Sequence, residues 1–204
     1  MLKRIFIIGL VVISLISCQS NKKQPPAVAA NDPSLESRLN EYMKSNQDLN
    51  FERMMDYIYP KLFEIAPKED MIKAMNSFFD SKEMKVKMDS IHVTKIHPIF
   101  SMGDGQYAKV EYSMVMYMDF SPAENEVGDS AQNKLVEKSM ATKYGDENVS
   151  LDSAGVLKIR TGTPMVAVKD KYAKEWSFVS LKDDDPMIHK LFTQEVLDKL
   201  ATYQ

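Results

Sequence analysis

The sequence predicts an α+β fold in which a curved, mostly antiparallel sheet packs on N-terminal helices and a helix ends the chain. Three observations lead to this prediction. Apolar residues recur at three- and four-residue steps over residues 33–79, which is the spacing of amphipathic helices. The period changes to two over residues 84–120, which is typical of strands with one buried face. Helices and strands come in separate runs, and this order favours antiparallel pairing over an alternating α/β sheet.

Three helices are expected at the start of the domain. Asp32 can cap the first helix, with Pro33 at its first position. Pro60 interrupts the second apolar pattern and should break the helix near residues 56–59. The third begins at Pro67-Lys68-Glu69-Asp70, whose acidic side chains suit a helix N-terminus. The buried face expected for the third helix consists of Met71, Ala74, Met75, Phe78 and Phe79.

Strands are expected over residues 84–120. The apolar positions of residues 84–88 and 91–93 have opposite parity, which indicates a bulge near Ser90. Pro98 should lie at an edge or bulge because it cannot donate to a ladder. Gly103-Asp104-Gly105 predicts a turn. The next strand has one apolar face, made of Ala108, Val110, Tyr112, Met114, Met116, Met118 and Phe120.

The last third of the chain returns to mixed elements. A helix over residues 130–144 should end at Gly145. Its thin apolar stripe consists of Leu135, Val136, Met140 and Tyr144. Short strands are expected near residues 148–151, 156–161 and 165–169, followed by a longer one over residues 172–181. Trp176 and Phe178 share a face of that strand and are the predicted core anchors. One C-terminal helix should open at Asp183-Asp184-Asp185-Pro186.

The first 17 residues have the pattern of a bacterial lipoprotein signal peptide. Lys3-Arg4 precede an uncharged apolar run that is shorter than the ~20 residues of a membrane span. The run ends in Leu15-Ile16-Ser17-Cys18, which resembles the lipobox. That resemblance implies that residues 1–17 are removed and that Cys18 carries a lipid anchor in the bacterial cell envelope. Gln19 stands where an inner-membrane retention signal would place Asp, so the expected destination is the outer membrane.

Residues 18–32 form the lipidated cysteine and a tether. The segment holds polar residues and Pro25-Pro26 without any period, so we expect a flexible connection. Residues 33–204 then form a single α+β domain. The alternative for the N-terminus is an ordinary secretory signal with an accidental cysteine. Since Cys18 is the only cysteine, no intrachain disulfide is possible. A net charge of −3 gives no electrostatic footprint for a nucleic acid, so no nucleic-acid partner is expected.

Two short motifs carry a family resemblance. Tyr59-Pro60-Lys61-Leu62-Phe63 precedes Pro67-Lys68-Glu69, and Lys174-Glu175-Trp176-Ser177-Phe178 lies near the end. With the order of elements, they make residues 46–200 similar to an uncharacterised group of secreted bacterial lipoproteins. Those proteins have the nuclear-transport-factor-two-like cone fold of the cystatin-like class. The resemblance implies a cone that can enclose an apolar pocket.

Methionines dominate the expected interior of the cone, and the chain has 15 of them. Methionine fills irregular cores and lines adaptable pockets. The residues expected to line a pocket are Tyr112, Met114, Met116 and Met118 from the strand, and Met54, Met55, Met71 and Met75 from the helices. Such a pocket would be apolar and noncatalytic and would take a lipid-like or aromatic ligand. Alternatively, the same side chains fill the cone, and the outer face of the sheet binds an envelope protein.

Two other functions remain open from the sequence. Related cone enzymes, which include isomerases and dehydratases, set an Asp or His base opposite a Tyr or acid donor. Asp119 has the opposite parity to Tyr112, and no position matches, so no catalytic residue and no cofactor are expected. Three thioethers on one strand face are also soft ligands for Cu(I), which leaves a copper carrier as an alternative. His92 and His97 are five residues apart and point to opposite faces of a regular strand, so no metal site is expected there.

Overall fold

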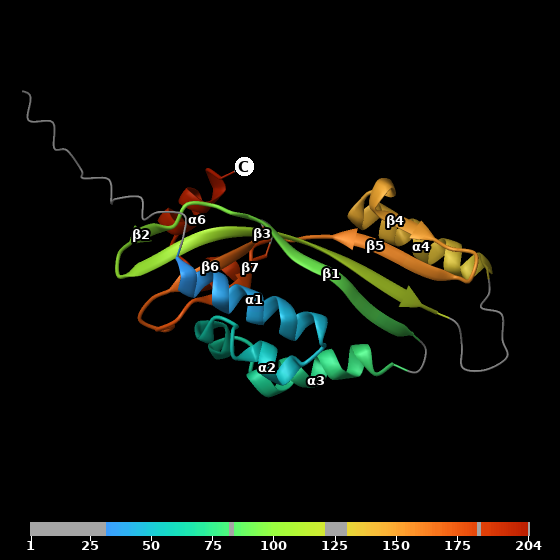
Figure 1. Cartoon of the computed structure of the whole chain (residues 1–204), viewed down its shortest axis with the longest axis horizontal. Coiled ribbons are helices and arrows are strands. Elements are labelled where there is room, and N and C mark those ends of the chain that lie inside the picture. The colour runs from blue at the N-terminus through green and yellow to red at the C-terminus, as the bar shows by residue number, and fades with distance from the viewer. Residues whose placement is uncertain (1–31, 82–83, 121–129, 183–184, 204) are drawn as a thin grey trace, which may run out of the picture.

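The computed structural model describes residues 32–81, 84–120, 130–182 and 185–203. These residues have an α+β fold with six α-helices, two short 3₁₀ helices and a curved antiparallel sheet of seven strands (Figure 1). The predicted fold class is therefore confirmed. The expected signal segment, Cys18 and all of the tether before Asp32 lie outside the described residues. No helix within the described ranges is long and apolar enough to cross a membrane.

The longest strand, β3, organises the sheet. One edge of β3 pairs with β1 and β2, and the other edge pairs with β6 along its first half and with β5 along its second half. β4 extends the sheet beyond β5, and β7 extends it beyond β6. The strands are β1 (Lys85–Ile96), β2 (Phe100–Met102), β3 (Gly105–Asp119), β4 (Val149–Leu151), β5 (Val156–Thr161), β6 (Met165–Lys169) and β7 (Ser177–Ser180). The sheet thus has two parts that share one long strand.

Gly162 allows β5 and β6 to pair with the same edge of β3. It lies between β5 and β6, where the partner of β3 changes from one strand to the other. A Cβ atom at Gly162 would stand 1.9 Å from the carbonyl oxygen of Tyr112. Only glycine allows so close an approach of two backbones.

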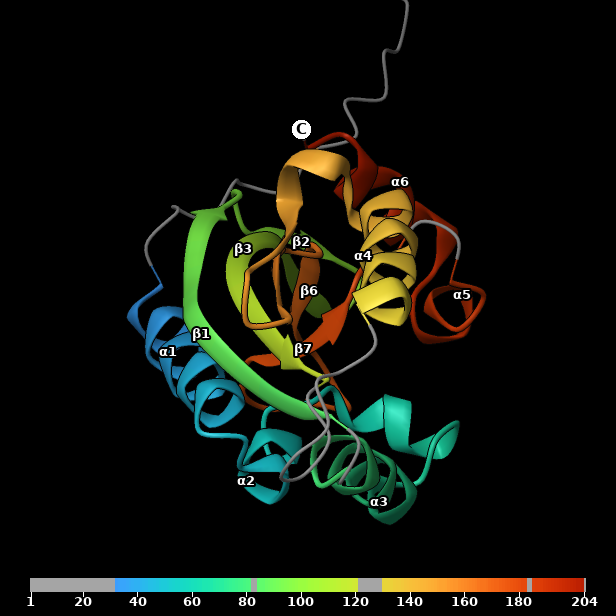
Figure 2. The same cartoon turned by 90° about the vertical axis from the view of Figure 1, so that its right-hand side faces the viewer.

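The bulge predicted near Ser90 is confirmed. Ser90 has a φ of 52°, and the pairing register of β1 against β3 shifts between Asp89 and His92. A second shift lies between Val93 and Lys95. Extra residues on one strand of a pair bend it, and Figure 2 shows β1 as a strongly curved strand. Pro98 lies in the connection to β2, outside the ladder, as predicted.

Three α-helices and a 3₁₀ helix precede the sheet: α1 (Pro33–Gln47), α2 (Phe51–Met55), η1 (Pro60–Glu64) and α3 (Lys68–Phe79). The predicted break at Pro60 is confirmed, because α2 ends before it and η1 starts with it. The predicted buried face of α3 is wrong at Ala74 and Phe78, which are exposed, and no residue of α3 is fully buried. The reason is that α3 packs along one flank against α2 and the neighbouring core, through Met71, Ile72, Met75 and Phe79.

The second half contains α4 (Ser130–Tyr144), which covers the β4–β5 end of the sheet (Figure 1). It ends at Gly145, with a φ of 94°, as predicted. Val136, Met140 and Tyr144 pack against Met118 and its neighbours, but Leu135 is 70% exposed and lies outside the predicted stripe. Two turns of the stripe are enough to cover this small part of the sheet.

The C-terminal region differs from its prediction in two ways. The expected single helix is two helices, α5 (Ile188–Leu191) and α6 (Gln194–Ala201), because Phe192 is extended and Thr193 caps α6. The apolar side chains of both helices still face one core, which is why the pattern looks continuous. The strand expected over residues 172–181 begins only at Ser177. Asp170 accepts hydrogen bonds from the backbone N–H groups of Tyr172 (2.9 Å) and Ala173 (3.0 Å), which forms a turn there.

Candidate functional site

The side chains expected to line one pocket lie in separate places. Met54, Met71 and Met75 line a cavity of about 240 Å³, here called the methionine cavity. Tyr112 and Met114 line a second cavity of about 680 Å³, here called the strand cavity. Met55 and Met118 are buried in the core, and Met116 packs in the cluster under α4. The expected common lining is therefore divided, because the two parts of β3 are covered by different helices.

The methionine cavity lies between the N-terminal helices and the C-terminal region. The chain turns at Pro60, so that α2, η1 and α3 surround the edge of the sheet beside β7 and α5. The wall is formed by Tyr42, Asn46, Met54, Ile58, Leu62, Met71, Met75, Val179, Ser180, Asp185, Met187, Ile188 and Leu191. Asp185 is its only carboxylate among the described residues, and one of its oxygens accepts from the Met187 N–H at 2.9 Å. The wall is otherwise mainly thioether, aliphatic and aromatic.

The strand cavity is a gap between two cores. Ala108 and Val110 of β3 pack in the cluster under α1, whereas Met116 and Met118 pack under α4. Met114 lies between these stretches and lines the gap, next to Tyr112. The other lining residues are Lys143, Tyr144, Asn148, Arg160, Thr161, Gly162, Thr163, Ser180 and Lys182. Among the residues that the structure describes, this wall contains three cationic residues and no carboxylate.

The two cavities share Ser180 at the end of β7. Tyr42 lines the methionine cavity, and Tyr112 lines the strand cavity. Burial raises the pKa of Tyr42 far above its usual range, and the nearby Tyr112 raises it further. Burial also raises the pKa of Tyr112. Both phenols therefore stay protonated at neutral pH, and their hydroxyls can donate hydrogen bonds.

Trp176 and Phe178 are deeply buried, with exposed fractions of 1% and 0%, in the cluster under α1. The Phe178 N–H donates to the carbonyl of Tyr57 at 2.7 Å, and its own carbonyl accepts from the Tyr59 N–H at 3.0 Å. The segment after α2 thereby covers the outer edge of β7. The ring of Tyr42 stacks on Phe178 with centroids 5.1 Å apart, which connects this core to the methionine cavity.

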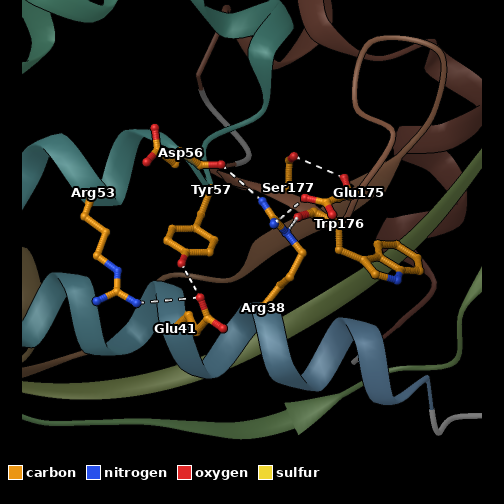
Figure 3. Close-up of polar contacts among 8 residues, drawn as sticks. All are labelled: Arg38, Glu41, Arg53, Asp56, Tyr57, Glu175, Trp176 and Ser177. Carbon is orange, nitrogen blue, oxygen red and sulfur yellow. Dashed lines mark hydrogen bonds and ion pairs between the residues drawn. The ribbon is translucent and has the colours of Figure 1, made fainter.

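Arg38 holds the same region from the other side (Figure 3). Its Nε donates to the carbonyl of Trp176 at 2.6 Å, and its Nη2 donates to the carbonyl of Asp56 at 3.1 Å. Its Nη1 pairs with Glu175 at 2.6 Å. One guanidinium thus joins α1, the end of α2 and the approach to β7. Sequence reasoning missed Arg38, because two of its three partners are backbone carbonyls, which leave no side-chain pattern.

A second polar group stands beside it on α1 (Figure 3). The Tyr57 hydroxyl donates to the carboxylate of Glu41, and Arg53 lies 3.7 Å from the same carboxylate. The hydrogen bond with Glu41 raises the pKa of Tyr57, with burial adding to the effect. Each of these charges has a partner within the group, so the arrangement fastens α2 to α1.

His92 on β1 and His97 just after β1 have different hydrogen-bond partners. Nε2 of the buried His97 lies 2.6 Å from Glu111, and this hydrogen bond lowers the pKa of the Glu111 carboxyl. His92 is exposed, and its Nδ1 lies 2.8 Å from the carbonyl of Ser90. Within the described ranges, no three His, Cys, Asp or Glu side chains stand together as a metal site would require.

No protein-family model matches this chain, and no curated protein matches it. The chemistry of the two cavities and the N-terminal pattern are therefore the basis for a function.

Proposed function

We propose that this chain is a lipid-anchored protein of the bacterial cell envelope whose domain binds an apolar small molecule without catalysis. Cys18 would carry the anchor and hold the protein at the outer membrane. The tether before Asp32 would span at most roughly 50 Å when extended. The domain would then work close to the membrane surface, where apolar molecules concentrate.

The observation that carries the proposal is the methionine cavity. Three of the methionines that the sequence singles out line a space of about 240 Å³. Thioether side chains are flexible and polarisable, so they fit ligands by shape rather than by charge. A ligand there would be held mainly by buried apolar area, at roughly 25 cal/mol per Å².

The structure favours this function over its alternatives on specific grounds. A filled cone that leaves only the outer sheet for a partner is at odds with the open space beside Met71 and Met75. A copper site on one strand face would need the sulfur atoms of Met114, Met116 and Met118 to line the same space. Met118, however, is buried under α4, while Met114 lines the strand cavity. An isomerase-like site would need a carboxylate beside Tyr112, and the described wall around Tyr112 has lysines instead.

Native mass spectrometry tests the proposal directly. The full chain is extracted from cell membranes and measured with and without prior organic extraction. We expect an adduct of one apolar molecule that disappears after extraction, and binding of a hydrophobic dye that appears once the molecule is removed. A chain that carries no adduct and binds no dye would contradict the proposal.

A further inference from the structure

We propose that the ligand is a single-chain anionic amphiphile, with its tail in the methionine cavity and its acidic head in the strand cavity. This inference rests on the proposed function and adds to it the charge of the ligand and the length of its tail. Ser180 lines both cavities, so they adjoin at this residue, and the proposal places one molecule across it. Neither cavity alone indicates such a ligand; the indication comes from an apolar space that adjoins a cationic one.

The charge of the head follows from the wall of the strand cavity. Lys143 near the end of α4 and Lys182 just after β7 come from elements on two sides of it. Neither forms an ion pair with any residue in the described part of the chain. Asp183 and Asp184, which follow Lys182, lie outside that part. The ammonium group of Lys143 lies 5.0 Å from the centroid of the Tyr144 ring, and an anion in the cavity would give both ammonium groups an ionic partner.

Arg160 also lines the strand cavity, but the pairing register indicates that its side chain is poorly placed to bind the head group. Thr161 pairs with Met114, and Arg160 pairs with Val115. Neighbouring residues of a strand point to opposite faces, so Arg160 occupies a position that faces away from Met114. The two lysines are therefore the residues that the inference assigns to the head.

Hydroxyl-bearing residues in the two walls suit the same ligand. Tyr42 lines the methionine cavity, Tyr112 lines the strand cavity and Ser180 lines both, so the two walls include three residues with hydroxyl groups. Since burial raises the pKa of both tyrosines, they remain neutral donors rather than competing anions. Donors are what the oxygen atoms of an acidic head group require.

The length of the tail follows from the volume of the methionine cavity. If each carbon atom of the tail takes ~30 Å³, the volume that one water molecule has in the liquid, about 240 Å³ corresponds to roughly eight carbon atoms. Each buried methylene should tighten binding about fourfold until the cavity is full. A longer tail should bring little further gain, because its extra methylenes would remain outside the cavity.

Methyl NMR on the full, lipidated chain in nanodiscs tests the inference, with ¹³C-methyl methionine as the label and empty nanodiscs as the reference. The probes are octanoate, octanol and octylamine, and alkanoates of four to twelve carbons. We expect shifts of the Met54, Met71 and Met75 methyl groups, and none at Met118. Octanoate should bind about three- to fivefold more tightly than octanol, the gain of one or two partly exposed ion pairs. Octylamine should bind most weakly.

The variant Lys143→Gln/Lys182→Gln should remove the preference for octanoate while octanol binds as before. Lys138→Gln/Lys190→Gln removes the same charge from α4 and α5 at exposed positions outside both cavity walls, and it should keep the preference. If octanol and octanoate bind equally in the wild type, the anionic head is wrong and the apolar pocket stands. If no probe moves the cavity methionines, the proposed function itself fails. An affinity that keeps rising fourfold per carbon beyond ten carbons would overturn the assigned tail length.

Discussion

The indole N–H of Trp176 donates to Oδ2 of Asp32 at 2.9 Å, while Oδ1 of the same carboxylate accepts from the Ser34 N–H at 2.9 Å. One carboxylate therefore caps α1 and joins it to the segment that enters β7. Asp32 is also the residue at which the predicted tether meets the domain. The start of α1 is thus fixed to the core of the protein by a side chain that lies 144 positions later in the chain.

Replacing Trp176 by Ala should lower the free energy of unfolding by about 3–5 kcal/mol, because a fully buried ring is removed from the core. Trp176→Phe keeps most of the apolar contact and loses the hydrogen bond to Asp32, so it should cost about 1–2 kcal/mol. Urea unfolding followed by far-UV circular dichroism measures both. A Trp176→Ala protein that unfolds at the wild-type urea concentration would show that Trp176 is not a core anchor.

The stability should depend on pH through Asp32. Hydrogen bonds from Ser34 lead the causes that lower its pKa below the ordinary value of 3.8, with the bond from Trp176 contributing and burial opposing. A lowered pKa in the folded state stabilises the fold above pH 3.8, and this contribution is lost as the pH falls through the folded value. Urea unfolding at several pH values, followed by Trp176 fluorescence, measures this contribution to the free energy of unfolding. The stability difference between wild type and Asp32→Asn should shrink below pH 3.8, and a difference that stays constant would contradict this role.

The sequence predicts most of the fold because local patterns decide it. The parity change after Ser90, the turn at residues 103–105 and the break at Pro60 are each visible in a few residues. The corrections concern features that depend on distant contacts. Phe78 looks buried by its spacing, but it is 45% exposed because α3 packs on one flank only. The break at Phe192 keeps the apolar period on both sides, so periodicity alone cannot show it.

In the candidate site, too, local features could be predicted from the sequence and features that depend on distant contacts could not. Its residue types could be predicted, since Tyr112, Met114, Met54, Met71 and Met75 all line a cavity. Their distribution over two cavities could not be predicted, because it depends on which helix covers each part of β3. The cationic wall was also missed. Lys143 and Lys182 are separated by 39 positions and look like ordinary surface lysines in the sequence.

Gly162→Ala should destabilise the protein by about 3 kcal/mol, the upper range for overpacking, because the new methyl group would collide with the Tyr112 backbone. Gly103→Ala is the matched control. It has no atom within 4 Å of the added Cβ and only the strain of a φ of +58°, so it should cost about 1 kcal/mol. Thermal unfolding compares the two. Equal costs would mean that β5 and β6 do not need the close approach at Gly162.

Replacing Cys18 by Ser should abolish metabolic labelling with palmitate and release the protein from membranes, because the thiol proposed to carry the lipid is gone. Ser20→Ala changes a residue next to the lipobox without removing the thiol and should leave labelling unchanged. Cell fractionation and fluorography measure both. A Cys18→Ser protein that still labels and sediments with membranes would rule out the lipid anchor.

The most direct test of the apolar pocket is photolabelling of intact cells with an alkyl diazirine, followed by peptide mapping of the purified chain. We expect labels on α3 around Met71 and Met75 and on α5 around Ile188, because these residues line the methionine cavity. Met75→Trp should fill part of the cavity and reduce this labelling several-fold. Phe78→Trp adds the same ring on the exposed side of α3 and should leave it unchanged. Labelling that is spread over the surface and equal in all three proteins would contradict a ligand-binding cavity.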